Sequence, residues 1–137
     1  MSDVIDEFLQ RYAKAFLSFK ATAINEHYEF PAILYTEAGE VVVFTEEEFT
    51  SNSTQLLEKY KSLSIGHIDF EILNKSSASN SLEFVEVMWH FKTSDRQNVY
   101  SANTNYLLKS NLGDYKIVSV FMVNEATEFS KVAGEHL

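Results

Sequence analysis

The stretch HYEFPAILYTEAGE, residues 27–40, holds the chain's single proline, Pro31, and one of its four glycines, Gly39. The residue before a proline is pushed toward extended backbone, so a helix must end before Pro31, and PAILYT is predicted to form a strand. The EAGE segment predicts a turn, because Gly39 can adopt positive φ without steric cost. The run VVVF, residues 41–44, is therefore expected to return as the second strand of a hairpin.

Three helices are predicted around this hairpin. Residues 3–19 carry apolar side chains at spacings of three and four, and residues 21–27 form a short second helix that ends before the proline. Thr45 followed by Glu48 is a capping box, which predicts a third helix over residues 45–61. The apolar face of the first helix consists of Ile5, Phe8, Leu9, Tyr12, Phe16 and Phe19.

Four strands are predicted after the third helix, over residues 65–73, 82–92, 98–109 and 115–124. Alternate residues of a strand face opposite sides of the sheet, and in the first three strands one set is apolar while the other is polar or mixed. One face of the sheet is therefore expected to meet the helices. The side chains assigned to this face include Phe70, Val85, Val87, Trp89, Phe91, Tyr100, Ala102, Thr104, Tyr106 and Leu108.

The order of these elements predicts an α+β fold. We expect a cone-shaped, curved sheet, antiparallel or mixed, with three N-terminal helices on its concave face. Residues 1–124 are expected to form a single domain. Residues 125–137 are expected to be a polar C-terminal tail that contains a short helix.

The last predicted strand, residues 115–124, departs from the pattern because its residues are apolar on both sides. A strand covered on both faces needs a second partner. No further large helix is predicted, so a second copy of the chain is the simplest cover. The sequence therefore predicts a homodimer through the mixed sheet face, with Val118, Val120 and Met122 in the interface.

Composition excludes several classes of function. The chain has 137 residues, 45% of them hydrophobic and 14% aromatic, which suits one domain with a bulky core. Its net charge of -9 opposes binding to nucleic acid or to anionic membranes. It lacks cysteine, so disulfides and thiolate chemistry are excluded. The acidic N-terminus is unlike a signal peptide, and no apolar run reaches a membrane span, so a cytoplasmic location is expected.

The chain resembles the nuclear transport factor two-like superfamily, which includes ketosteroid isomerase and the SnoaL-like polyketide cyclases. The resemblance covers roughly residues 4–124. It lies in the helix pattern FLQRYAKAF, in INEHYEFPAILYTEAGE, in the capped helix after VVVFT, and in the four strands that follow. It implies a pocket between the helices and the sheet, and many members are homodimers through the sheet.

The same resemblance implies roles for three residues. The isomerase branch uses a tyrosine on the first helix, an aspartate base near the first hairpin, and a protonated aspartate on a late strand. Tyr12 matches the tyrosine, whereas Thr36 and Thr104 stand at the two carboxyl positions. A phenol and two hydroxyls can orient a ligand but are poor at abstracting a proton.

The leading functional hypothesis is an aromatic-lined pocket that binds a small, mostly apolar molecule without a cofactor. One alternative is an isomerase, dehydratase or cyclase that uses Tyr12 and an acid such as Glu29 or Glu37. Another is a homodimeric protein-interaction or assembly module. The predicted ligand-binding residues are Tyr12, Phe16, Tyr35, Thr36, Trp89, Thr104 and Tyr106.

A metal site is considered and not favoured. His90 shares a predicted sheet face with Asp69, Glu71 and Glu86, but cross-strand ion pairs explain these residues better than metal binding. Ser/His/Asp order, a glycine-rich phosphate loop and an HExxH motif are all missing from the sequence. We therefore predict that no metal is required, so that prolonged chelation should leave the melting temperature unchanged.

Overall fold

The computed structural model describes residues 4–133, and within them six strands form one sheet in the order β2-β1-β6-β5-β4-β3. Neighbouring strands are antiparallel, except that β1 and β6 pair in parallel. The sheet is therefore mixed, as predicted. The strands are β1 (Tyr28–Tyr35), β2 (Val41–Phe44), β3 (Ile65–Ser77), β4 (Leu82–Thr93), β5 (Asn98–Asn111) and β6 (Asp114–Met122).

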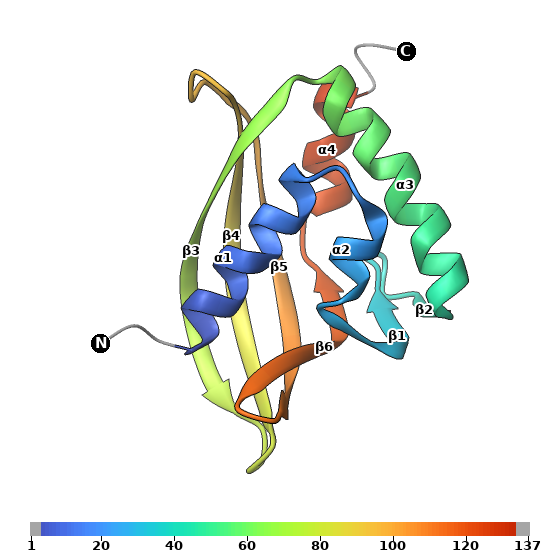
Figure 1. The fold of residues 1–137 in the computed structure, drawn as a ribbon, viewed down its shortest axis with the longest axis vertical. Helices are drawn as coiled ribbons and strands as arrows, with labels where there is room; N and C mark the ends of the chain where they lie inside the picture. The colour runs from blue at the N-terminus through green and yellow to red at the C-terminus, as the bar shows by residue number, and fades with distance from the viewer. Residues whose placement is uncertain (1–3, 134–137) are drawn as a thin grey trace.

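Four helices accompany the sheet within the described residues. They are α1 (Val4–Leu17), α2 (Ala21–Asn25), α3 (Glu46–Ser62) and α4 (Glu125–Ala133). Figure 1 shows α1 crossing the long strands β3, β4 and β5, with α3 running along the side that carries β2. The α+β class and the three helices from the N-terminal half are confirmed. The fourth helix packs against β5 and contributes Phe129 and Val132 to the core.

The ends of two elements follow from local chemistry. The capping box at the start of α3 is confirmed: Thr45 Oγ1 accepts a hydrogen bond from the Glu48 N–H, and Glu48 accepts one from the Thr45 N–H. In the turn between β1 and β2, Gly39 has φ of +84°, as its predicted role requires.

The prediction that β1 starts at Pro31 is wrong, because β1 already begins at Tyr28, which pairs with Ile117 of β6. The pairing with β6 is irregular between Tyr28 and Ile33. Pro31 lies inside this irregular segment, where its missing N–H removes no regular ladder bond.

The apolar concave face of the sheet is confirmed. Trp89 and Phe91 of β4 and Tyr100 and Tyr106 of β5 are all buried. Together with α1 they form the main hydrophobic core. The core is therefore largely aromatic.

The two-sided pattern of β6 has a different cause from the one predicted. The pairing with β5 advances one residue on β5, from Leu107 to Leu108, while it moves two residues on β6, from Ser119 to Ile117. Val118 is the extra residue of a β-bulge, which shifts the alternation of faces by one position. Ile117, Val120 and Met122 therefore all lie on the concave side.

The placement of Val120 and Met122 in an outer-face interface is consequently wrong, since both line the interior cavity described below. The homodimer itself stays a prediction. Separately, none of the helices within residues 4–133 combines the length and the apolar character needed to cross a membrane.

Candidate functional site

A cavity of about 310 Å³ lies between the concave sheet face and the helices. Its wall consists mostly of aromatic and aliphatic side chains, contributed by all four helices and all six strands of the described residues. Such a cavity, apolar with a few polar groups, is what small-ligand sites in proteins usually look like. The aromatic lining residues include Tyr12, Phe16, Tyr60, Trp89, Phe91, Tyr100, Tyr106 and Phe129.

The phenol groups of the wall are hydrogen-bonded in pairs. The Tyr12 and Tyr28 hydroxyls lie 2.5 Å apart, and the Tyr60 hydroxyl from α3 lies 2.7 Å from the Tyr100 hydroxyl of β5. Trp89 Nε1 donates to the Tyr106 hydroxyl at 2.9 Å. Burial is the main cause that raises the pKa of each of these tyrosines. The phenols are therefore neutral at physiological pH and can act as hydrogen-bond donors rather than bases.

One carboxyl group also lines the cavity, and it belongs to Glu125 in the first turn of α4. Its Oε2 accepts a hydrogen bond of 2.6 Å from Thr104 Oγ1, and Thr104 itself is fully buried. Burial raises the pKa of the Glu125 carboxyl, the Thr104 hydrogen bond opposes this rise, and the nearby Glu37 charge reinforces it. The cavity therefore contains an acid whose pKa is closer to neutral pH than the pKa of an exposed glutamate.

Contacts with β5 and with the first hairpin fix Glu125 in place. Asn124 Oδ1 accepts the Asn103 N–H at 2.7 Å, which ties the start of α4 to β5. The Glu37 carboxylate accepts the Thr127 N–H at 2.9 Å and the Thr127 hydroxyl at 2.5 Å. A carboxylate at this end of a helix is favoured by the helix dipole.

Sequence reasoning missed Glu125 because it treated the segment after residue 124 as a polar tail. A signal was present in the spacing. Glu125 precedes Phe129 by four residues and Val132 by seven, so the three share one face of a helix. Phe129 and Val132 pack against the core, and Glu125 therefore faces inward with them.

The structure brings most of the predicted ligand-binding residues together. Tyr12, Phe16, Trp89 and Tyr106 line the cavity. Thr104 is not among the residues that line the cavity, but its hydroxyl donates a hydrogen bond to Glu125, which does line it.

Two predicted ligand-binding residues lie elsewhere. The Tyr35 ring stacks on Phe121 with centroids 4.9 Å apart, on the outer sheet face, because it alternates with the inward Leu34. Thr36 belongs to the turn, where its Oγ1 accepts the Glu40 N–H at 3.1 Å. Their placement in the pocket was therefore wrong.

Comparison with known proteins assigns the family. A family model described as NTF2-like protein (DUF6841) matches residues 2–125. The chain belongs to this NTF2-like family. Among curated proteins, none matches the sequence significantly.

Solved structures share the NTF2-like fold at low sequence identity. An NTF-2 like protein of unknown function from Shewanella oneidensis has a TM-score of 0.64 at 16% identity, over 87% of this chain and 95% of the other. A ketosteroid isomerase-like protein from Erwinia carotovora has a TM-score of 0.63 at 17% identity, over 86% and 91%. A domain of unknown function with a cystatin-like fold from Nostoc punctiforme has a TM-score of 0.64 at 12% identity, over 85% and 72%.

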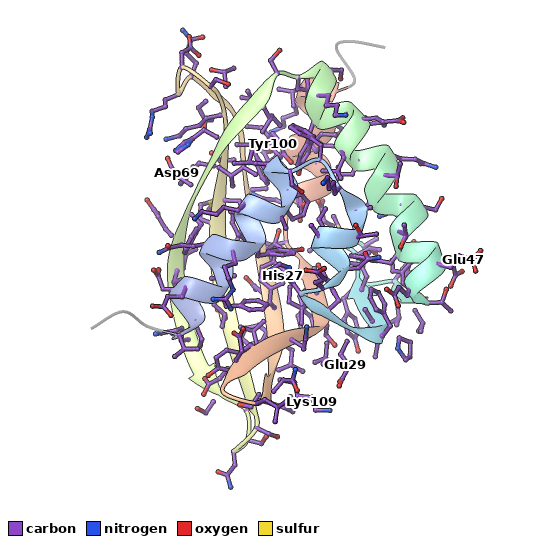
Figure 2. All side chains as sticks on the ribbon, viewed as in Figure 1. His27, Glu29, Glu47, Asp69, Tyr100 and Lys109 are labelled. Atoms are coloured by element: carbon purple, nitrogen blue, oxygen red, sulfur yellow. The ribbon has the colours of Figure 1, made fainter. Side chains whose placement is uncertain are left out.

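The other acids considered for the NTF2-like site are engaged elsewhere. Glu29 pairs with Lys109 at 3.2 Å near the lower end of the sheet in Figure 2. Glu37, as described above, caps α4. Of these three acids, only Glu125 lines the cavity.

The residues considered for a metal site bind other side chains. Asp69 contacts both His67 and Lys92 at 2.8 Å, and His90 Nδ1 is bonded to Ser101 at 2.7 Å. Within the described part of the chain, no group of three or more His, Asp or Glu side chains is arranged to hold a metal ion. That metal is not required stays a prediction, which the chelation experiment tests.

Replacing Glu125 with glutamine should stabilise the NTF2-like domain at neutral pH, on the order of 1 kcal/mol. Folding raises the pKa of the Glu125 carboxyl above its value in the unfolded chain, near 4.5. Its contribution to the stability of wild type is therefore largest below pH 4.5 and is lost as the pH rises through the pKa of the folded state. Glutamine can still accept the Thr104 hydrogen bond and carries no charge. The free energy of unfolding of Glu125→Gln minus that of wild type should therefore grow from pH 4 to pH 7, as measured by urea titration. A difference that is flat with pH would contradict the assignment.

Proposed function

We propose that the cavity of this NTF2-like domain binds a small, mostly apolar molecule. The observation that supports this most is the cavity of about 310 Å³ itself, with a wall of aromatic and aliphatic side chains. The paired phenols and Glu125 supply a few polar groups that could fix the orientation of a ligand. The cytoplasm is the location we propose for this activity, on the sequence alone.

Native mass spectrometry of freshly purified protein tests this proposal. Wild type should retain a small molecule that denaturation releases. Leu56 lines the cavity, so Leu56→Trp should fill part of it and reduce the retained fraction. Leu112→Trp is the matched control. Leu112 is fully exposed in a turn, so this substitution should leave the retained fraction unchanged. Equal retention by wild type and Leu56→Trp would count against binding in this cavity.

A second candidate function is an isomerase, dehydratase or cyclase, and Glu125 is the observation that favours it. A carboxyl with a raised pKa beside neutral phenols has the groups needed to move a proton on a bound carbonyl compound. Steroid double-bond migration above the buffer rate, lost in Glu125→Gln, would support this candidate. If the protein did not raise the rate above that of buffer, it would not isomerise this steroid, and binding without catalysis would be the better explanation.

The homodimer prediction now concerns different residues of the outer sheet face. Phe84 and Phe121 are half-buried there, with ring centroids 5.6 Å apart, next to Tyr35. Asn103 Oδ1 and Asn105 Oδ1 are buried and lack a hydrogen-bond partner among the described residues. A second copy packed on this face would cover the exposed parts of these rings.

We expect wild type to be a dimer at micromolar concentration in light scattering, and Phe121→Lys to be a folded monomer with a lower melting temperature, because the partner and the ring contacts to Tyr35 and Phe84 are both lost. Burying a lysine in an apolar interface is costly, whereas the same lysine is solvated in a monomer. Lys116→Ala, on the same strand, is the control and should remain dimeric. A monomeric wild type would contradict the prediction and the assembly-module alternative with it.

A further inference from the structure

The Glu125 carboxyl group in the cavity is not paired with a basic side chain of the cavity wall. Of the described residues that line it, Glu125 is the one acid and Lys59 the one base. Lys59 is exposed, and its Nζ lies 6.0 Å from the Phe129 ring centroid. The contact to the Glu125 carboxylate comes instead from the neutral hydroxyl of Thr104. Such a carboxylate is stabilised when a cation enters beside it.

The rest of the wall also suits a cation. The rings of Tyr60, Phe91, Tyr100 and Phe129 form a continuous cluster, with neighbouring centroids between 4.4 and 6.4 Å apart. Phe129 is one turn of α4 beyond Glu125, so the cluster and the carboxylate are parts of the same cavity. Aromatic faces attract ammonium groups, most strongly where water is excluded. The overall charge of -9 favours the approach of cations over that of anions.

We propose that the ligand of this cavity is a small organic cation, an alkyl- or arylalkylammonium whose charged group binds Glu125 and whose apolar part lies against the aromatic rings. This inference rests on the proposed function and specifies its ligand class. Thr104 holds Oε2 of the carboxylate. The ammonium N–H groups donate to the remaining lone pairs of the carboxylate, in the charge-assisted geometry that makes such bonds strong.

The proposal predicts the pH dependence of binding. An alkylammonium stays protonated up to about pH 10, so between pH 4.5 and 8 it keeps its charge while Glu125 titrates. Affinity should therefore rise with pH as Glu125 loses its proton. The other titratable or charged groups that face Glu125 or line its cavity are Tyr12 from α1, Tyr28 from β1, Glu37 from the first turn, Tyr60 and Lys59 from α3, and Tyr100 and Tyr106 from β5. The tyrosines stay neutral over this range.

Calorimetric titration with matched probes tests the proposal. The cations are 2-phenylethylammonium and cyclohexylammonium, and the neutral counterparts of similar shape are 2-phenylethanol and cyclohexanol. In wild type at pH 7.5 each cation should bind about tenfold to a hundredfold more tightly than its alcohol, the range expected for one charge-assisted hydrogen bond. Glu125→Gln should abolish this preference. Glu128→Gln should keep it, because Glu128 belongs to the same helix and pairs with Lys131 outside the cavity.

The outcomes separate this inference from the proposed function. Equal binding of cations and alcohols in wild type, or a preference that survives Glu125→Gln, would overturn the cation inference and leave apolar ligand binding intact. No binding of any of the four probes would overturn both. A preference that falls with rising pH between 4.5 and 8 would also contradict the role of Glu125. Circular dichroism melts should show that both glutamine variants are folded.

Discussion

Replacing Val120 with aspartate is expected to destabilise the domain by about 3–5 kcal/mol, enough to leave much of it unfolded at 25 °C. Val120 is 9% exposed and pairs with Tyr106 on the concave side of the bulge in β6. An aspartate there would be an unpaired charge in an apolar cavity wall. The Glu125 carboxylate lines the same cavity, so the second negative charge would add repulsion.

The matched variant is Val118→Asp, two positions earlier in the same strand. Val118 is the extra residue of the bulge and is only half-buried, so this change should cost about 1 kcal/mol, near the cost of placing aspartate in a strand. Urea unfolding at pH 7 measures both. A regular strand without a bulge would place Val118 and Val120 on one face, so similar losses for the two variants would refute the bulge.

Tyr60→Ala should cost about 3–5 kcal/mol, the usual range for removing a buried aromatic side chain. Tyr60 is 1% exposed and joins α3 to the sheet, since its ring contacts Phe91 and Tyr100 and its hydroxyl is bonded to Tyr100. It also contacts Phe16 from α1 and Phe129 from α4. Removal should therefore loosen three helices at once and enlarge the cavity.

Tyr60→Phe keeps the ring and isolates the hydroxyl. It should cost about 1–2 kcal/mol, because the Tyr100 hydroxyl loses its buried partner while the packing stays. Urea midpoints and slopes of wild type and the two variants give the comparison. If Tyr60→Ala lost no more stability than Tyr60→Phe, the ring would not be the anchor of α3.

Local chemistry made much of the fold predictable. The capping box of Thr45 and Glu48 marked the start of α3, and strict alternation in residues 82–92 and 98–109 identified the concave face. These signals depend on neighbours within a few residues, so one sequence is enough to detect them. Tyr12, Phe16, Trp89 and Tyr106 were predictable for the same reason, because each lies on the apolar side of a regular element.

The features that the sequence did not predict depend on pairing and packing between segments that are distant in the chain. The bulge at Val118 exists only relative to Leu107 and Leu108 of β5, so alternation within β6 alone gave the wrong faces. The start of β1 at Tyr28 depends on its pairing with Ile117. Glu125 was missed because the segment after residue 124 was treated as a polar tail, whereas the packing of α4 on β5 turns the carboxyl group into the cavity.

The parallel pairing of β1 with β6 bears on how the chain folds. Strands β3 to β6 pair with their neighbours in sequence, so their contacts form after short loops close. The ladder between Ile33 and Ser119 joins segments separated by most of the chain, and closing so long a loop costs more entropy before any contact repays it. We therefore expect the four-strand meander to form first, and the hairpin of β1 and β2 to dock late. The cavity would close only at that last step, so a bound ligand would slow unfolding more than it speeds folding.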